Sequence, residues 1–491
     1  MSSTSFLNKS DAQQVINRFG SPLYVYDEQI IRKRCQELKQ AFGGWKNTRF
    51  HYAMKANSNL HILKIIQEQG FCVDAVSIYE AELAFLAGFT KEQILFTINN
   101  MSDEEMHYAQ SKGILLNIDS LSRLEKYGKA YPKSSVCVRM TPEVTAGHHA
   151  KVQTGYKESK FGILFEEIAM LLQIAKKYRL HIIGLHEHTG SGIKDMNVTL
   201  KSMNGLMSVA SQFPELEFMD FGGGFSIPYK PNEKRFDLQS FGKKTTKLFA
   251  AFSKKRGKEL ALVFEPGRYC VAESGMLLCK VTAIKERGKK AIIGVDTGFN
   301  HLIRPVMYDS YHHIVNLSTN EKDKKQKKYD IYGNICESGD CFGKERMLSE
   351  VKEGDILAIL DTGAYGFSMA SQYNSRPLPA EVLIKDGKPT FIRKRQTFED
   401  ILKNTVKCSS WKILNVKSFM NEVNVKILFK VIVHCSSEQR SHHNLLEHSH
   451  LQHCINVVEV QCFPCNSRSL LLVHRDAATL LQDQRQQQLL F

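Results

Sequence analysis

The chain has 491 residues, of which 43% are hydrophobic and 24% are charged. These values are ordinary for a globular protein, so they exclude a largely disordered or fibrous chain, and the length suggests two or three domains. The net charge is +15, but the basic residues are scattered and form no stripe interleaved with aromatic residues. We therefore expect no nucleic-acid partner.

The amino terminus lacks the basic segment and following apolar stretch of a targeting signal. No run of residues reaches the roughly 18 apolar residues of a membrane helix. We therefore expect no membrane partner and a cytoplasmic location. Unpaired cysteines are normal in that reducing compartment.

Eight short apolar runs rich in β-forming residues alternate with stretches of helical period between residues 49 and 268. They span residues 49–56, 71–77, 94–100, 115–120, 136–140, 182–189, 218–225 and 261–268. Repeated β-α units of this kind predict a (β/α)8 barrel, which is an α/β fold. A doubly wound open sheet is the alternative that the pattern leaves open.

The pattern changes after about residue 290, where apolar runs follow one another without long helical spacers. These runs, at 291–295, 329–335, 355–360, 381–384 and 390–392, predict a mainly antiparallel β domain. Residues 22–26 also have the composition of a strand, which could belong to either domain. Beyond Asn404 the chain is rich in Cys, His and Gln and shows no clear period.

Polar residues stand at the ends of the predicted barrel strands, where a packed core would have apolar ones. They include Lys55, Asp74, Asn99, Asp119, Arg139, His186, His188, Glu265 and Arg268. In a barrel the carboxyl ends of all strands lie on one face, which is where barrel enzymes have their active sites. The sequence therefore predicts an active site at this rim.

Three of these features suggest particular chemistry, although each also has a plain structural explanation. Lys55 lies in an apolar strand and either reaches solvent or is an amine of lowered pKa that reacts with a carbonyl cofactor. Glycines 222–224 form either a tight turn or a place where backbone N–H groups approach a phosphate. Glu265 and Arg268 either form a surface ion pair or bind a pyridine nitrogen and an anion.

Two further groups of residues have alternative interpretations. His186 and His188 are two apart in a strand, face the same side and could ligate a metal. The rim supplies no obvious third ligand, so we favour an imidazole that stacks on an aromatic cofactor, and we expect no metal. Cys336 stands next to Glu337 and near Asp340, and is either a buried structural cysteine or a proton donor in a charged pocket.

Six motifs occur in order along the chain. They are residues 52–57 (Tyr-Ala-Met-Lys-Ala-Asn), 188–191 (His-Thr-Gly-Ser), 222–224 (Gly-Gly-Gly), 265–268 (Glu-Pro-Gly-Arg), 336–340 (Cys-Glu-Ser-Gly-Asp) and 363–365 (Gly-Ala-Tyr). Together they resemble the fold-type III pyridoxal-phosphate decarboxylases over roughly residues 15–404, and most of all the diaminopimelate decarboxylases. The resemblance implies an alanine-racemase-like barrel followed by a β domain. It also implies pyridoxal 5'-phosphate as cofactor and the conversion of meso-2,6-diaminopimelate into L-lysine and CO2, the last step of lysine biosynthesis.

The resemblance also implies roles for individual residues. Lys55 would bind the cofactor covalently, His188 would stack on its ring and Glu265 would pair with the pyridine nitrogen. The other cofactor-binding positions are Asp74, Glu80, Arg139, Ser191, Gly222, Gly223, Gly224, Gly267, Arg268 and Tyr365. The substrate-binding positions, on an amino-acid substrate, are Arg268, Arg304, Tyr308, Glu337 and Tyr365.

Cys336 is the implied acid that returns a proton to the substrate carbon, which makes it the second catalytic residue beside Lys55. In the family, this cysteine loop reaches into the site of the neighbouring subunit. The resemblance therefore implies a homodimer with shared active sites.

We expect four segments along the chain. Residues 1–35 pack on the β domain, 36–285 form the cofactor-binding barrel, 286–404 form the β domain, and 405–491 are an atypical tail. We interpret the tail as a disordered appendage or as a product of read-through or a wrongly assigned exon. A zinc site is a weaker alternative, built from Cys462 and Cys465 with the histidines at 442, 443, 448, 450 and 453.

Two rival functions differ from this interpretation. A decarboxylase of the same fold could act on ornithine, arginine or carboxynorspermidine, although Arg304 and Tyr308 favour a substrate with a second carboxylate. An inactive regulatory homologue would be expected to have lost Lys55 or Cys336, and both are present.

Overall fold

The structure is a computed structural model, and it describes residues 5–142, 144, 147, 149, 151, 153–288, 290–319, 326–406, 456–462 and 467–473. The chain divides into two units, Met1–Leu402 and Lys403–Phe491. The division falls close to the point at which the sequence changes composition.

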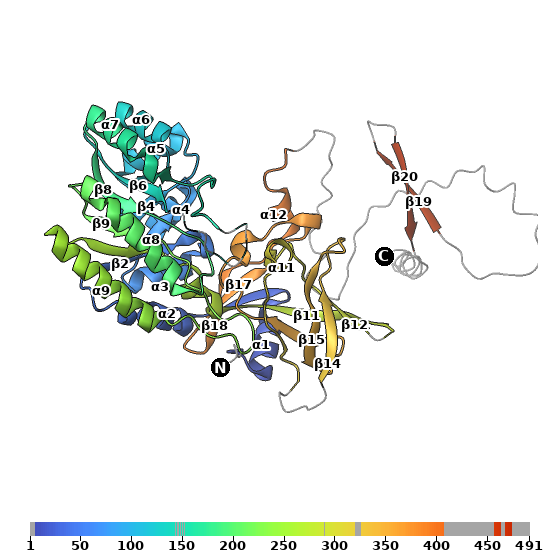
Figure 1. Ribbon diagram of the computed structural model, residues 1–491. Coiled ribbons are helices and arrows are strands. Elements are labelled where there is room, and N and C mark those ends of the chain that lie inside the picture. Colours follow the sequence, from blue (N-terminus) through green and yellow to red (C-terminus); the bar gives the residue numbers. More distant parts are fainter. Residues whose placement is uncertain are drawn as a thin grey trace, which may run out of the picture. The chain divides into compact units, whose positions relative to one another are not determined.

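Eight parallel strands in the first unit form a closed barrel, shown in blue to yellow-green in Figure 1. In barrel order they are β2 (Thr48–Ala53), β3 (Cys72–Ala75), β4 (Ile94–Thr97), β5 (Leu115–Ile118), β6 (Ser135–Thr141), β8 (His181–His186), β9 (Phe218–Asp220) and β10 (Ala261–Phe264). Strand β10 pairs with both β9 and β2, which closes the ring. The predicted (β/α)8 barrel is therefore confirmed, and the open sheet is excluded.

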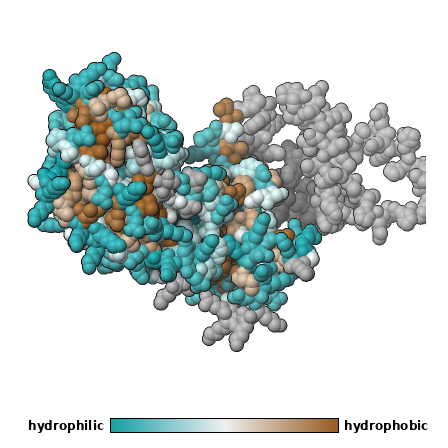
Figure 2. Space-filling model, in the orientation of Figure 1, coloured by the Kyte–Doolittle hydropathy of each residue, from teal (hydrophilic) through white to brown (hydrophobic). Residues whose placement is uncertain are grey.

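Helices cover the outside of the barrel (Figure 1). They are α2 (Glu28–Ala41), α3 (Leu60–Glu68), α4 (Ile78–Ala87), α5 (Asp103–Lys112), α6 (Leu121–Ala130), α7 (Ile168–Tyr178), α8 (Met196–Val209) and α9 (Leu238–Arg256), and the short strand β7 (Ile163–Leu164) pairs with β6. Most of them begin at a side chain that accepts a backbone N–H of the first turn, at Asp27, Asn59, Ser77, Ser102, Ser120, Asp195 and Asp237. Figure 2 shows hydrophilic residues with hydrophobic ones among them on the visible face of this part of the molecule. None of the helices in the described ranges combines the length and the apolar character that crossing a bilayer requires.

A second sheet of nine strands follows the barrel and confirms the predicted β domain. Its strands are β1 (Leu23–Asp27), β11 (Gly275–Arg287), β12 (Lys290–Val295), β13 (Ile314–Asn316), β14 (Gln326–Tyr332), β15 (Cys341–Ser349), β16 (Ile356–Ile359), β17 (Ala380–Lys385) and β18 (Lys388–Arg393). Most neighbours are antiparallel, while β1–β17 and β12–β14 are parallel. The short helices α10 (Arg268–Val271), α11 (Arg304–Tyr308) and α12 (Phe398–Leu402) complete this unit.

The amino-terminal segment belongs to this second sheet. Strand β1 pairs with β11 and β17, so the early strand whose place the sequence left open lies in the β domain. Helix α1 (Lys9–Phe19) packs beside it, because Val15, Ile16 and Phe19 share one apolar cluster with residues of β1 and β11. The expected boundary after residue 285 falls inside β11, which begins at Gly275 and pairs only within the second sheet.

The second unit contains one described hairpin, in which β19 (Asn456–Cys462) pairs with β20 (Ser467–Val473) in antiparallel fashion. Cys465 and the histidines of the zinc interpretation lie outside the described residues. The side chain of Cys462 also lies outside them. The expectations for the tail therefore remain predictions.

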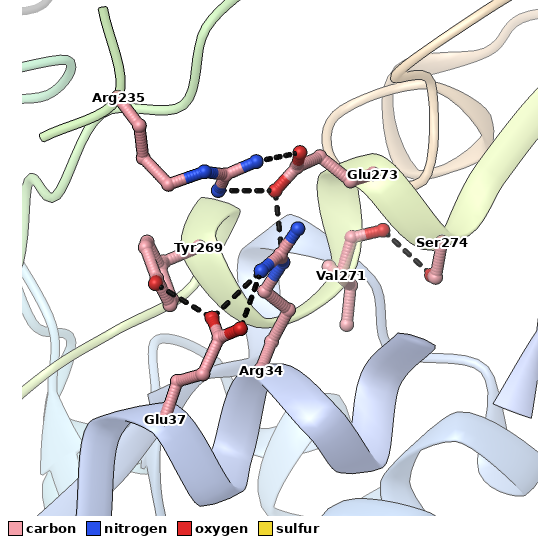
Figure 3. Close-up of polar contacts among 7 residues, drawn as sticks. All are labelled: Arg34, Glu37, Arg235, Tyr269, Val271, Glu273 and Ser274. Atoms are coloured by element: carbon pink, nitrogen blue, oxygen red, sulfur yellow. Dashed lines mark hydrogen bonds and ion pairs between the residues drawn. The ribbon is translucent and has the colours of Figure 1, made fainter. Parts of the chain in front are cut away.

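An ionic network joins α2 to the segment that follows β10 (Figure 3). Arg34 pairs with Glu37 at 2.7 Å and with Glu273 at 2.9 Å. Arg235 also pairs with Glu273, and the Tyr269 hydroxyl donates to Glu37 at 2.9 Å. The network holds α10 against α2, and α10 begins with Arg268, one of the predicted site residues.

Glu187 is a buried carboxyl group beside Ser202 of α8. It forms no ion pair with any described residue. Burial raises the pKa of Glu187 from 4.5 to about 8, and the Ser202 hydroxyl only partly opposes this shift. Because the folded state keeps the proton that the unfolded chain releases above about pH 4.5, this group contributes stability at low pH that is lost as the pH rises through 8.

We predict that Glu187→Gln becomes progressively more stable than the original protein as the pH rises. Between pH 6 and pH 9 the difference in unfolding free energy should grow by about 2–3 kcal/mol in favour of the variant. Urea unfolding of both proteins at the two pH values measures this difference. Glu399→Gln, at an exposed position of α12, is the matched control and should show no such trend. A difference that stays constant between pH 6 and pH 9 would contradict the prediction.

Candidate active site

A cavity of about 250 Å³ lies where the carboxyl ends of the barrel strands meet the β domain. It gathers most of the residues that the sequence singled out. These are Lys55, Asp74, Arg139, His188, Ser191, Gly224, Glu265, Gly267, Arg268, Arg304, Tyr308 and Tyr365. The predicted convergence of polar strand ends on one face is thus present in the structure.

Lys55 lies in a single 3-10 turn (Met54–Ala56) directly after β2, and its Nζ is 3.9 Å from the Asp74 Oδ2 atom. Burial, followed by the Glu265 charge, raises the pKa of Asp74 to about 8, although Lys55 opposes the shift. Burial disfavours the Lys55 ammonium, but Asp74 raises the pKa of Lys55 above its ordinary value. Of the two alternatives for Lys55, the amine of lowered pKa is therefore wrong, because the effect of Asp74 on the pKa outweighs that of burial. The Lys55 side chain is 41% exposed, as the other alternative, a lysine that reaches solvent, predicts.

Glu265 supplies a buried carboxylate to the same cavity. Its Oε1 atom is 3.1 Å from the Nε2 atom of His186, and a carboxylate can only accept, so the imidazole N–H donates. Burial opposes ionisation, but the nearby His186 and Lys55 hold the pKa of Glu265 well below its ordinary value. The carboxylate therefore stays ionised and oriented.

His188 presents a neutral imidazole. The Gly223 N–H donates to its Nδ1 atom at 3.1 Å, so the ring proton must be on Nε2. Burial, together with Lys55, lowers the pKa of His188 well below its usual range. The two histidines thus have separate partners. His186 binds and orients the Glu265 carboxylate, whereas His188 is held by the Gly223 N–H, as a ring that stacks on a cofactor could be. His186, Asp220 and Glu265 nevertheless bring ligand atoms within 4.8 Å of one another, and the expectation of no metal remains a prediction.

Glycines 222–224 form a turn, here called the glycine cradle, in which side chains larger than hydrogen would be strained or would clash. Gly222 and Gly224 have φ values of +65° and +101°, in the left-handed region that favours glycine. A Cβ atom at Gly223 would lie 2.0 Å from the Glu265 carbonyl oxygen. Nearby, Arg268 donates to the Ser191 hydroxyl at 2.9 Å. This arrangement suits a phosphate, which backbone N–H groups, hydroxyl groups and a guanidinium bind well.

The remaining predicted residues do not line the cavity. Of the three cradle glycines, only Gly224 lines the cavity itself. The Glu80 carboxylate accepts the Val76 N–H at 2.8 Å near the start of α4. Cys336 and Glu337 lie on an exposed loop between β14 and β15. The Tyr373 hydroxyl donates to Glu337 at 2.6 Å there.

Several residues of the site have no signal in the sequence. Phe161, whose ring centre is 4.5 Å from the Arg139 guanidinium, follows no motif or period. Tyr229 and His312 contact Arg268 and Arg304 respectively, and both come from irregular segments. The sequence indicates His186 as a polar strand end and a possible metal ligand, whereas the structure makes it the hydrogen-bond partner of Glu265.

Comparison with known proteins agrees with this geometry. The family model for the pyridoxal-binding domain of pyridoxal-dependent decarboxylases matches residues 28–272. A diaminopimelate decarboxylase from Methanothermobacter thermautotrophicus is 42% identical over 402 residues, which are 80% of this chain and 94% of the relative. The chain belongs to the diaminopimelate decarboxylase family. The family member from Escherichia coli is 37% identical and covers 78% of this chain and 93% of its own length.

Solved structures of the diaminopimelate decarboxylase family have the same fold. One matches with a TM-score of 0.76 and 35% identity, covering 82% of this chain and 98% of its own. The Helicobacter pylori diaminopimelate decarboxylase complexed with L-lysine matches with a TM-score of 0.72 and 34% identity, over 80% of this chain and 98% of its own. The lysine/ornithine decarboxylase of Vibrio vulnificus, at 20% identity, shares the fold alone.

Pyridoxal phosphate is the cofactor of this family, and the residues of the cavity fit it. Lys55 offers the amine, His188 a flat neutral ring, and Glu265 an ionised carboxylate for the pyridine nitrogen. The glycine cradle, which a Cβ atom would fill, offers room for the phosphate.

We predict that Gly223→Ala weakens cofactor binding. The new methyl group would collide with the backbone at Glu265, and relieving such overpacking costs about 1–3 kcal/mol. The affinity for pyridoxal phosphate should then fall by roughly tenfold or more, as measured by titration of the apoprotein. The control is Gly205→Ala in α8, where the new atom would meet the Phe165 ring at an ordinary 3.6 Å. Unchanged affinity in Gly223→Ala would mean that the cradle does not hold the phosphate.

Proposed function

We propose that the chain decarboxylates meso-2,6-diaminopimelate to L-lysine and CO2. The observation that carries this proposal is a pair of buried arginines, Arg268 and Arg304, in the same cavity as Lys55 and Glu265. Among the described residues neither arginine forms an ion pair with a carboxylate. A cavity with two uncompensated cations suits an anionic ligand and, beyond the cofactor phosphate, a substrate with a second carboxylate.

The roles of the residues follow from their chemistry. Pyridoxal phosphate, when bound, supplies a sink for the electron pair that remains on the substrate carbon as CO2 leaves. Lys55 holds the cofactor, and Glu265 keeps the ring nitrogen in its protonated form. Arg304 and Tyr308 hold the far carboxylate of the substrate, and Glu337 its far ammonium group. Cys336 returns a proton to the reacting carbon.

The same charges argue against the rival substrates. Ornithine and arginine carry a cation, not a carboxylate, at the far end. Binding them would leave the buried Arg304 guanidinium without an anion and bring a second cation towards it. When a buried protein group binds a particular group of the substrate, an analogue that lacks this substrate group binds poorly. The buried protein group is then left without a partner, which costs free energy.

A substrate panel tests the proposal. We predict CO2 release with meso-diaminopimelate and with no other member of a panel that also holds ornithine, arginine and carboxynorspermidine. Lys55→Ala should release no CO2 and should lose the visible absorbance of the lysine-bound cofactor. Release from ornithine alone would overturn the proposed substrate. An intact cofactor absorbance without CO2 release from any substrate would indicate an inactive homologue.

We also propose a homodimer in which each site takes Cys336 and Glu337 from the partner subunit. Both residues are exposed on a loop and do not line the cavity of their own chain. An exposed thiol and carboxylate with proposed roles in a buried cavity need a second copy of the chain to bring them there.

Mixing two inactive variants tests the shared site. In a mixed dimer of Lys55→Ala and Cys336→Ala, one of the two sites combines an intact lysine with an intact cysteine. Random mixing should therefore restore roughly a quarter of the original activity, because half of the dimers are mixed. Each variant alone is the control and should stay inactive. No recovery in a sample shown to contain mixed dimers would contradict the shared site.

We propose that the protein works in the cytoplasm. The seven cysteines whose side chains the structure describes are all free, and Cys35 and Cys270 stay unpaired although they contact each other. A proton donor such as Cys336 must remain a reduced thiol, which a reducing compartment ensures.

A further inference from the structure

Arg304 is held in its buried position by neutral groups. The side chain is fully enclosed, with only 1% of the residue exposed. One of its terminal nitrogens, Nη1, lies 2.8 Å from the Nε2 atom of His312, and the other, Nη2, lies 3.2 Å from the Ser310 hydroxyl. The Tyr229 ring centre is 4.8 Å from the guanidinium. Among the described residues no carboxylate pairs with it.

The hydrogen bonds of His312 fix its protonation state. Its Nδ1 atom is 2.8 Å from the Leu360 carbonyl oxygen, which can only accept, so Nδ1 carries the proton. The Nε2 atom must then present its lone pair, because Arg304 can only donate. A second proton on this ring would point an N–H at the guanidinium. Burial, and then the Arg304 charge, lower the pKa of His312 well below its usual range.

Because the acceptor of Arg304 is a neutral imidazole, the charge of the guanidinium is not cancelled as it would be by a carboxylate. Buried arginines are usually paired with a carboxylate, which orients the guanidinium but also cancels its charge. His312 also orients Arg304, at 2.8 Å, but as a neutral acceptor it leaves the charge available. The Leu360 carbonyl, next to β16, anchors the imidazole to the second sheet, so the guanidinium is fixed relative to a rigid element.

We propose that His312 is a positioning residue that holds Arg304 with its charge uncompensated, ready for the substrate carboxylate farthest from the reacting carbon. This inference rests on the proposed function. L-Lysine keeps this carboxylate after the other has left as CO2, whereas cadaverine lacks it. Comparing L-lysine with cadaverine therefore separates recognition of the far carboxylate from the other contributions to binding.

The test compares two variants of the holoenzyme that differ only in charge. His312→Gln places a neutral oxygen within reach of Arg304, and the isosteric His312→Glu places a carboxylate there. We expect the L-lysine dissociation constant, measured by calorimetry, to stay within about threefold in His312→Gln and to rise at least about tenfold in His312→Glu. Cadaverine should not bind more weakly to His312→Glu than to His312→Gln. The KM for meso-diaminopimelate should follow the L-lysine result, with kcat changed much less.

A merely structural role predicts a different result, because both substitutions would then disturb packing and weaken both ligands alike. Equal L-lysine affinities in the two variants, or an equal loss for L-lysine and cadaverine, would overturn the inference. If His312→Glu does not fold, Ser310→Asp brings a carboxylate to the other side of the guanidinium, with Ser310→Asn as its neutral match. The binding measurement needs no turnover, so it is independent of the substrate panel that tests the proposed function.

Discussion

Strand β10 pairs with β2 in parallel, with Phe264 opposite Phe50, and this pairing closes the barrel. It also brings Lys55 and Glu265, which are far apart in the sequence, to neighbouring strand ends. The N–H of Ala53, the last residue of β2, donates to the Pro266 carbonyl just beyond β10, so the pairing continues into the loops that carry the site. Without this closure the amine and the carboxylate would lie on opposite edges of an open sheet.

Closure also explains the division of charge in the cavity. The interior of the barrel contributes acids, since Asp74 and Glu265 are buried at the strand ends beside Lys55. The β domain contributes Arg304, and Arg268 begins the short helix that leads from the barrel to this domain. The ionic network between α2 and α10 fixes that helix from behind (Figure 3). A ligand therefore meets the Lys55 amine, two acids and the Arg139 guanidinium on the barrel side, and the guanidinium groups of Arg268 and Arg304 on the other.

The barrel could be predicted from the sequence because each of its strands is a short run of apolar residues. Such continuous runs are typical of strands that are buried on both faces, as in a parallel sheet. Most predicted runs extend past the carboxyl ends of the strands, because site residues such as Lys55, His188 and Arg268 follow the strands directly. Periodicity could not place β1, because it says nothing about which strands pair. It also could not give the direction of the Lys55 pKa, which depends on a carboxylate from the neighbouring strand. His312 escaped notice because its role depends on a carbonyl oxygen 48 residues away in the sequence.

Two imidazoles in this site illustrate how the backbone can set a protonation state. A backbone N–H fixes His188 as an acceptor at Nδ1, whereas a backbone carbonyl fixes His312 as a donor at Nδ1. The two rings are therefore opposite tautomers, and both are neutral. Neither adds charge to a cavity whose ligands are anionic at the phosphate and carboxylate ends. The net charge of the cavity is therefore set by Lys55, the arginines and the buried carboxyl groups. Adding one charge at either imidazole would change the binding of an anion more than it would change the packing around the ring.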